Sequence, residues 1–135
     1  METSSFRILI ADNFEPWRHY ASSMLQKDES LQIVGVASDG FEAVQKAIEL
    51  KPDLVLLSVG LSKLNGLETA KRIGEAVPGV KLLFATQNTD PDVMTGALSN
   101  GSHGYILKMD ASRELLPAIR AIRRGEKFIG SGMKG

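Results

Sequence analysis

The sequence has no cysteine, no net charge and no long hydrophobic run. The absence of cysteine excludes disulfides and thiolate metal sites, and it suits a reducing cytoplasm. With 16 basic and 16 acidic residues, the charge balance demands neither a nucleic-acid nor a membrane partner. The apolar stretch near the N-terminus is too short for a signal peptide or a membrane span. We therefore expect a cytoplasmic protein that has no membrane contact.

The residues that are present indicate one globular domain. The chain has 135 residues, of which 43% are apolar and 24% are charged. A chain of this size and composition buries a sizeable core and does not remain disordered. No linker, internal repeat or low-complexity tract divides it. We expect a disordered tail over residues 1–5, a folded domain over 6–128, and a C-terminal tail or the start of a linker over 129–135.

Short apolar runs alternate with segments of helical periodicity. Five runs recur along the chain: Ile8–Ala11, Leu31–Val36, Leu54–Leu57, Lys81–Ala85 and Gly104–Leu107. The third run has no polar residue within it, which is typical of a strand buried on both faces. Strand and helix alternate five times, and this predicts an α/β fold. The expected architecture is a doubly wound, five-stranded parallel sheet with helices on both faces.

Several residues mark where the helices are expected to begin. Asp39 and Asp90 are suitable N-caps, and Pro91 suits the first position of a helix. Pro117 lies inside the fifth helical segment, where its missing N–H and its ring oppose a regular helix. We therefore expect that helix to start late, at Ser112, or to bend locally.

Polar side chains follow four of the five apolar runs. They are Asp12 and Asn13 after the first run, Ser58 after the third, Thr86 after the fourth and Lys108 after the fifth. The carboxyl ends of parallel strands share one edge of a sheet, so these side chains are expected to converge in one crevice. An acid, hydroxyls and an amine gathered there predict a functional site.

Four stretches resemble motifs of one signalling family. They are ILIADN (8–13), PDLVLLSVGLSKLNGLE (52–68), LLFATQN (82–88) and GYILK (104–108). Together they resemble the receiver domain of bacterial two-component response regulators over residues 6 to 130. The phrases RILIAD, IVGVASDG, LNGLE and RAIRRGE look most like the LuxR-type branch, in which a helix-turn-helix DNA-binding domain usually follows. The resemblance implies a flavodoxin-like receiver fold with strand order 2-1-3-4-5.

The sequence departs from this family at the residues that perform its chemistry. The family moves a phosphoryl group from a histidine kinase to an aspartate, with Mg²⁺ held by three acidic groups and a backbone carbonyl. Here the phospho-acceptor position is Ser58, the acidic pair is Asp12 with Asn13, and the matching carbonyl belongs to Gly60. Ser62 replaces the proline common in the following loop. We expect no cofactor and weak or absent Mg²⁺ binding at this degenerate site.

The remaining motif residues match the family. The resemblance assigns the family lysine to Lys108 and the switch pair to Thr86 and Tyr105. With two carboxylates missing, Asp12 is the natural partner of Lys108. Thr86 and Tyr105 are expected either to pack passively or to form a switch with a different trigger.

Three functions remain open at this point, and none of them is an enzyme. The first is a receiver-like module of a transcriptional regulator that dimerises or docks a partner through Pro91–Arg124 without phosphorylation. It would contact DNA only through a helix-turn-helix domain that this sequence does not include. The second is a working phosphorelay receiver that uses Ser58 or Asp12 as acceptor. The third is a small-ligand-binding doubly wound module, although no glycine-rich phosphate loop follows the first run.

Other polar residues are given structural roles. His19 and His103 are single and unclustered, so we expect surface or helix residues and not metal ligands. The final helical segment carries a basic stretch of Arg120, Arg123, Arg124 and Lys127. No aromatic or helix-turn-helix pattern accompanies it, which favours a solvated or partner-facing surface over a DNA contact.

Overall fold

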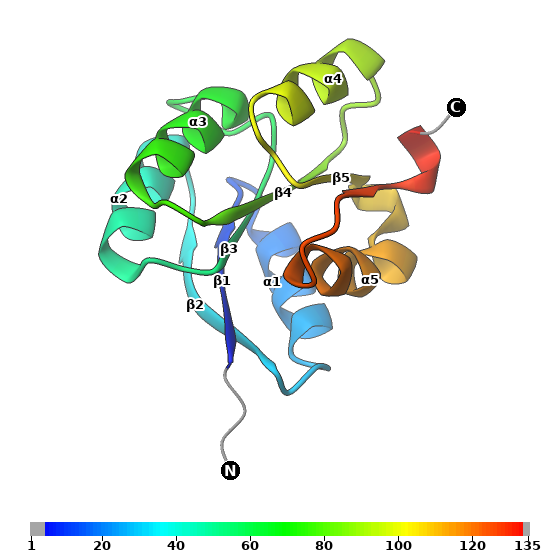
Figure 1. Ribbon diagram of the computed structural model, residues 1–135, viewed down its shortest axis with the longest axis horizontal. Helices are drawn as coiled ribbons and strands as arrows, with labels where there is room; N and C mark the ends of the chain where they lie inside the picture. The colour runs from blue at the N-terminus through cyan, green and yellow to red at the C-terminus, as the bar shows by residue number, and fades with distance from the viewer. Residues whose placement is uncertain (1–4, 134–135) are drawn as a thin grey trace.

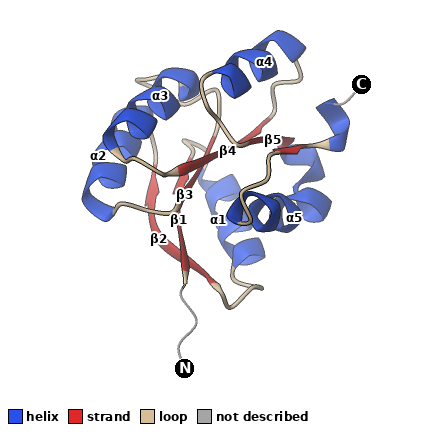
Figure 2. Ribbon diagram, in the orientation of Figure 1, coloured by secondary structure: helices blue, strands red, loops and turns tan. Residues whose placement is uncertain are grey.

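The computed structural model describes residues 5–133, and its centre is a parallel sheet (Figures 1 and 2). The strands are β1 (Phe6–Ala11), β2 (Leu31–Ala37), β3 (Leu54–Leu57), β4 (Lys81–Thr86), β5 (Gly104–Leu107) and β6 (Phe128–Ile129). They lie in the order β2-β1-β3-β4-β5-β6, and each neighbouring pair is parallel. The predicted receiver fold and the order of its five strands are confirmed, and β6 extends the sheet beyond β5.

Five α-helices cover the two faces of this sheet. They are α1 (Glu15–Leu25), α2 (Gly40–Leu50), α3 (Gly66–Ala76), α4 (Pro91–Ser99) and α5 (Ala111–Arg123). Two single turns, η1 (Lys108–Asp110) and η2 (Ser131–Met133), follow β5 and β6. Helices α1 and α5 pack on one face, and α2, α3 and α4 pack on the other (Figure 1). Among the described residues, no helix is long and apolar enough to cross a bilayer.

The continuous apolar runs supply both cores at once. In β3, Leu54 and Leu56 face the core under α1 and α5, while Val55 and Leu57 face the core under the other helices. All four side chains are at most 1% exposed. Burying a side chain of this size stabilises the fold by about 1.5–3 kcal/mol. A polar residue in β3 would therefore face one of the two cores.

Helix caps lie where the sequence placed them. The Asp39 carboxylate accepts a hydrogen bond from the Glu42 backbone N–H at 2.9 Å and caps α2. The Asp90 carboxylate accepts one from the Asp92 N–H at 2.9 Å, and Pro91 opens α4. Satisfying one unpaired N–H in this way is worth about 1 kcal/mol. Both predicted caps are confirmed.

Helix α5 begins at Ala111 and not at Ser112, and it continues through Pro117. The η1 turn leads into the helix from β5, so the chain is already helical one residue before the predicted start. Pro117 lies on the exposed side of the helix, as does Arg113, whose carbonyl loses its donor. Water can satisfy a carbonyl on that side, which is why the proline is tolerated there.

The packed chain extends beyond the predicted domain boundary at residue 128. The Phe128 N–H donates to the His103 carbonyl at 3.1 Å, and the Gly130 N–H donates to the Tyr105 carbonyl at 2.8 Å. Glu114 of α5, 8% exposed, accepts hydrogen bonds from the Ser131 N–H at 3.0 Å and the Ser131 hydroxyl at 2.7 Å. Residues 128–131, which we call the C-terminal strap, therefore lie against β5 and α5. Residues 1–4 of the expected N-terminal tail are outside the described part of the chain.

Replacing Glu114 should release the C-terminal strap. Glu114→Ala leaves the Ser131 N–H without its acceptor, and we expect a loss of about 1–3 kcal/mol in the free energy of unfolding. Glu114→Gln keeps an acceptor oxygen and should retain more of that stability. Urea unfolding and amide hydrogen exchange at Ser131 measure the two effects. Ser112→Ala, an exposed change on the same helix, is the control, and equal behaviour of Glu114→Ala and this control would contradict the assignment.

Candidate functional site

The carboxyl ends of β1, β3, β4 and β5 surround a crevice of about 560 Å³. Six of the residues singled out from the sequence line it: Asp12, Asn13, Ser58, Gly60, Thr86 and Lys108. Tyr105, which the resemblance assigned to a switch pair with Thr86, points into the core next to Phe84 and does not line the crevice. The parallel sheet brings these residues together because each follows the end of its own strand.

An ion pair between Asp12 and Lys108 occupies the centre of the crevice. The Lys108 Nζ lies 2.7 Å from Asp12 Oδ2, and the two side chains are 14% and 3% exposed. Asp12 Oδ1 accepts the Phe14 backbone N–H at 2.9 Å. Oδ2 has no well-aligned hydrogen bond, so its contact with Lys108 is an ion pair at close range. Both carboxylate oxygens are thus engaged by groups of the protein.

The Lys108 ammonium also contacts an aromatic ring that the sequence analysis did not single out. Its Nζ lies 5.2 Å from the ring centroid of Trp17, a cation–π distance. Trp17 is 7% exposed and belongs to the core under α1 and α5. Helical periodicity marks a buried residue at such a position, but it carries no signal that a lysine from the η1 turn after β5 will lie over it.

Ser58 is buried and uses its hydroxyl locally. It is 7% exposed, and its Oγ accepts a hydrogen bond from the Gly60 backbone N–H at 3.2 Å. Asp12 is the single acidic residue among those lining the crevice. The described residues contain no cluster of three His, Cys, Asp or Glu side chains suited to a metal ion. Mg²⁺ takes oxygen ligands that usually include one or two carboxylates, and the one carboxylate lining this crevice is paired with Lys108.

Two glycines fix the loop that follows Ser58. A Cβ at Gly66 would lie 2.0 Å from the Ser58 carbonyl oxygen, and a Cβ at Gly40 would lie 2.2 Å from the Leu64 carbonyl oxygen. The Gly66 N–H donates to the Val59 carbonyl at 2.8 Å, and the Asn65 side chain caps α3. The close backbone approach explains the glycine in the LNG motif. The LNG motif alone carries no sign of this approach between distant backbone segments.

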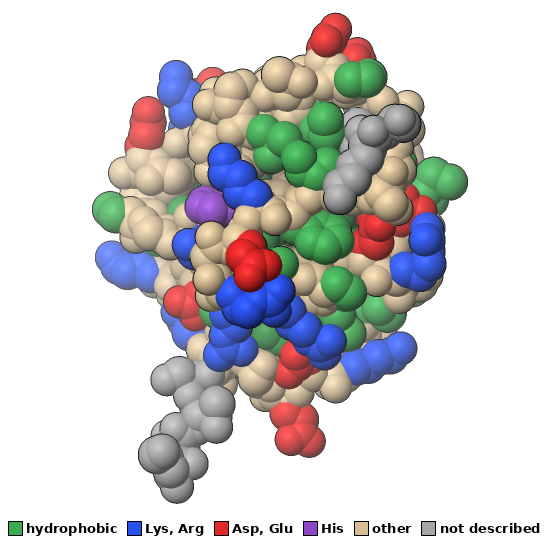
Figure 3. All heavy atoms as spheres, turned by 45° about the vertical axis from the view of Figure 1, so that its right-hand side comes forward, with side chains coloured by type: hydrophobic (Ala, Val, Ile, Leu, Met, Phe, Trp, Pro, Cys, Tyr) green, Lys and Arg blue, Asp and Glu red, His purple; other side chains and the backbone are tan. Residues whose placement is uncertain are grey.

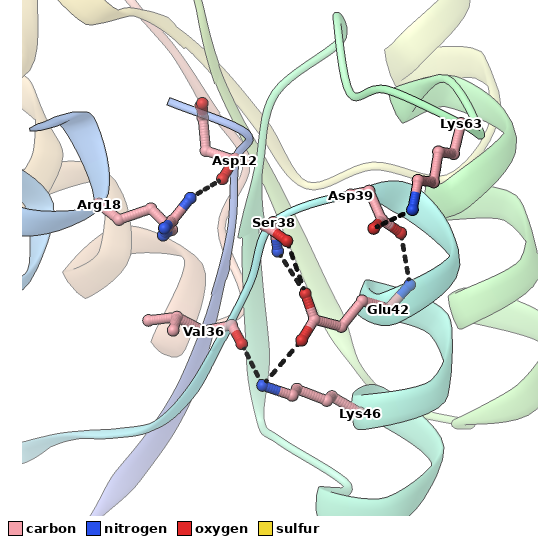
Figure 4. A network of polar contacts seen from close by, with 8 residues as sticks. All are labelled: Asp12, Arg18, Val36, Ser38, Asp39, Glu42, Lys46 and Lys63. Carbon is pink, nitrogen blue, oxygen red and sulfur yellow. Dashed lines mark hydrogen bonds and ion pairs between the residues drawn. The ribbon is translucent and has the colours of Figure 1, made fainter. Parts of the chain in front are cut away.

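The loop after Ser58 is also held by contacts with the start of α2 (Figure 4). Lys63 forms an ion pair with Asp39, the cap of α2, at 3.5 Å. The Glu42 carboxylate accepts a hydrogen bond from the Ser38 backbone N–H, and this bond lowers the pKa of the Glu42 carboxyl. On the opposite side of this view, Arg18 donates to the Asp12 carbonyl at 2.6 Å. These contacts leave the loops around the crevice with defined positions.

A chain of hydrogen bonds leads from Thr86 and Asn88, which line the crevice, to Tyr105 in the core. The Asn88 N–H donates to the Thr86 hydroxyl at 3.3 Å, and the Tyr105 hydroxyl donates to the Asn88 carbonyl at 3.1 Å. Tyr105 is fully buried, and this burial, with a smaller effect of Asp90, raises its pKa to about 12. The structure therefore links the end of β4 to β5 through a tyrosine that faces inward.

The remaining candidates have structural contacts. His103 lies in the loop before β5, and its Nδ1 accepts the Leu82 N–H at 3.1 Å. Burial lowers its pKa, and Lys81 and Lys127 act in the same direction. His19 is exposed on α1. Neither histidine belongs to a metal-binding cluster among the residues that the structure describes.

The basic stretch of α5 is largely paired within the molecule. Arg120 lies 3.3 Å from Asp28, Arg123 donates to Ser30 at 2.9 Å, and Arg124 lies 3.1 Å from Glu126. Figure 3 shows basic side chains gathered on one part of the surface, with acidic ones among them. The contacts of Arg120 and Arg123 join α5 to the turn before β2, whereas the pair of Arg124 and Glu126 is local to the end of α5, so a role in holding the fold accounts for part of the stretch.

The sheet order and the flanking helices are those of a flavodoxin-like receiver module. A profile of the family described as the response regulator receiver domain matches residues 8–120. This chain belongs to that family, and the expected resemblance is confirmed.

Known relatives extend beyond the length of this chain. The oxygen regulatory protein NreC of Staphylococcus haemolyticus (strain JCSC1435) is 35% identical over 124 residues, which are 91% of this chain and 57% of that protein. NreC of Staphylococcus aureus (strain JH9) gives the same identity and coverage. The chain therefore spans just over half the length of these relatives.

Solved structures share the fold. The response regulator domain of Thermotoga maritima CheB is 30% identical with a TM-score of 0.80, covering 86% of this chain and 94% of that one. A LuxR-family two-component response regulator from Aurantimonas sp. SI85-9A1 reaches a TM-score of 0.92 at 24% identity, covering 97% and 94%. The isolated REC domain of RcsB from Salmonella enterica serovar Typhimurium reaches 0.90 at 21%, covering 97% of each chain. The last two likenesses show the fold alone.

The raised pKa of Tyr105 predicts a specific loss of stability at alkaline pH. Its stabilising contribution is complete below the unfolded pKa near 10 and is lost as the pH rises through about 12, because the unfolded state releases the proton first. We expect the wild type to lose about 2–3 kcal/mol more than Tyr105→Phe between pH 8 and pH 12. Urea unfolding of both proteins at the two pH values measures this difference. Parallel losses in the two proteins would show that Tyr105 does not titrate as its burial requires.

Proposed function

We propose that this receiver domain belongs to a LuxR-type transcriptional regulator and acts without phosphoryl transfer, by dimerisation or partner docking. The observation that carries the proposal is the 2.7 Å ion pair between Asp12 and Lys108, which engages the single acid lining the crevice. The names of the relatives describe regulators, and on this proposal the domain is a cytoplasmic signalling module with no enzymatic activity and no cofactor.

The chemistry of the crevice supports inactivity toward phosphate donors. Ser58 would need a base to remove its proton, and both oxygens of Asp12 are already engaged by Phe14 and Lys108. Asp53 lies at the opposite end of β3, where its carboxylate accepts the Arg7 N–H at 2.8 Å. Phosphorylation at Ser58 or Asp12 is therefore the competing function that the experiments below test.

The loss of carboxylates also weakens metal binding on this proposal. A unit charge about 4 Å from a divalent ion contributes about 8 kcal/mol of gross attraction at an effective dielectric constant of about 20. Desolvation offsets most of that energy, but each 1.4 kcal/mol that remains is about a tenfold change in affinity. Asn13 and Ser58 stand in two of the acidic positions of the family. On this proposal, Mg²⁺ therefore binds too weakly to occupy the site at useful concentrations of the ion.

The docking surface proposed from the sequence is Pro91–Arg124, and the faces that a partner could contact belong to its helices, α4 and α5. In α4, Ala97 is the one fully buried residue, so most of that helix is available for a partner. The outer edge of β5 is covered by β6, which leaves α4 and α5 as the faces to dock. One relative, RcsB, has been solved as dimers bound to DNA. For this chain we propose homodimerisation or partner docking through these helices, with DNA contact only through a separate helix-turn-helix domain.

Incubation with acetyl phosphate and Mg²⁺ should leave the wild-type chain unmodified. Because no free carboxylate or activated hydroxyl faces the crevice, we expect no added mass of about 80 Da, the mass of one phosphoryl group. Intact-mass spectrometry measures the result. A stoichiometric, Mg²⁺-dependent adduct mapped to Ser58 or Asp12 would contradict the proposal and establish the phosphorelay alternative.

Restoring both acids should restore metal binding. In Asn13→Asp with Ser58→Asp, the crevice gains two carboxylates on an unchanged backbone, so Mg²⁺ should compete with Lys108 for Asp12. The single tryptophan, Trp17, lies beside Lys108 and should report the change in a fluorescence titration with MgCl₂. The wild type and each single variant are the controls. A double variant with the same response as the wild type would show that the crevice lacks receiver geometry.

A further inference from the structure

A second, apolar pocket of about 420 Å³ lies beside the crevice. Its lining comes from three places: the start of α1, the end of β5 with η1, and the loop after β4. Phe14, Gln87 and Lys108 line both this pocket and the crevice. The receiver chemistry described above does not use this pocket.

Two large apolar side chains at this pocket are exposed. Met109 is 80% exposed and Phe14 is 55% exposed, while Trp17 and Leu107 beneath them are 7% and 5% exposed. Exposed apolar groups that gather around a concavity are typical of binding sites. A methionine thioether also makes favourable contacts with aromatic rings. The lining therefore favours a flat, apolar occupant, most readily an aromatic ring.

Among the described residues that line this pocket, one carries a charge. It is Lys108, whose ammonium lies 5.2 Å from the Trp17 ring and 2.7 Å from Asp12. An ammonium has three donors, so Lys108 can hold Asp12 and still donate to an anion approaching from the pocket. The Gln87 side chain supplies an additional amide on the same rim. This end of the pocket thus suits a ligand group that is anionic or that is a strong hydrogen-bond acceptor.

We propose that this pocket binds a small planar aromatic carboxylate, with its ring against Phe14, Trp17 and Met109 and its carboxylate at Lys108. The volume is within the range of about 300–1,000 Å³ that is usual for small-molecule sites. A partner helix is less suited, because a helix needs a groove long enough for anchors over several turns. This pocket is a single concavity from Phe14 to Met109.

Asp12 and the ligand carboxylate meet the same ammonium, so removing the Asp12 charge should strengthen binding. This consequence does not depend on whether Ser58 or Asp12 accepts phosphate. Binding is measured on unmodified protein without Mg²⁺, and a failure of the acetyl phosphate prediction would leave it unaffected.

The test is a titration with 4-nitrobenzoate, which quenches tryptophan on contact, read through Trp17. The neutral 4-nitrobenzyl alcohol is the matched ligand without charge. We expect saturable quenching by the carboxylate and an affinity about tenfold lower for the alcohol. Asp12→Asn should tighten binding of the carboxylate several-fold and leave the alcohol unchanged.

Variants of the exposed wall locate the site. Met109→Ala and Phe14→Ala should each weaken binding about fivefold or more. Tyr20→Ala is the control, because Tyr20 is 41% exposed and its ring lies 5.7 Å from that of Trp17, but it does not line the pocket. Circular dichroism checks that each variant is folded. In the wild type, the Met109 methyl resonance should shift on binding, which gives a readout independent of any variant.

Three results would overturn the proposal. The first is the absence of saturable quenching up to about 10 mM 4-nitrobenzoate, since a formed site should bind its ligand with a Kd in the millimolar range or below. The second is equal affinity for the acid and the alcohol. The third is unchanged binding in Met109→Ala and Phe14→Ala together with an unshifted Met109 methyl resonance, which would place the ligand elsewhere.

Discussion

The ion pair between Asp12 and Lys108 is the interaction on which the carboxyl edge of the sheet depends. It joins the end of β1 to the turn after β5, across the crevice that β3 and β4 complete. Two charges so little exposed are stable only together, and removing one partner of a buried pair costs about 3–5 kcal/mol. The pair therefore fixes two loops, positions Lys108 over Trp17, and leaves Asp12 without a free oxygen for a cation.

Behind this pair, contacts continue from the crevice to the C-terminal strap. Thr86 and Asn88 connect to the hydroxyl of Tyr105, and the backbone carbonyl of Tyr105 accepts the Gly130 N–H of the strap. Glu114 then holds Ser131 from α5. One buried tyrosine thus touches both the loop after β4 and the segment after β6. A conformational signal through it requires a second arrangement of the Tyr105 side chain, and the inward arrangement seen here is the one that keeps the bond from its hydroxyl to Asn88.

Most of the sheet and the convergence of polar residues followed from the sequence because they rest on local patterns. An unbroken apolar run such as Leu54–Leu57 signals a doubly buried strand, and the residue after each strand falls at a common edge. Contacts between distant segments carry no such pattern. The two-residue strand β6 is too short to show periodicity, and Glu114 is one of several charged residues in α5. The close approach of Gly66 to Ser58 and of Lys108 to Trp17 likewise appears only once the chain is folded.

The charge of the crevice connects the proposed loss of phosphoryl transfer with the proposed aromatic carboxylate ligand. The receiver pattern that this sequence resembles has three acids and one lysine at these positions, a formal charge of −3 + 1 = −2. Here Asp12 and Lys108 give −1 + 1 = 0 among the residues that line the crevice. A divalent cation loses most of its attraction in such a site, whereas an anion approaching Lys108 meets one carboxylate in place of three. On the proposed function, the uncharged side chains of Asn13 and Ser58 that disfavour phosphoryl chemistry also lower the repulsion that an aromatic carboxylate would meet in the adjoining pocket.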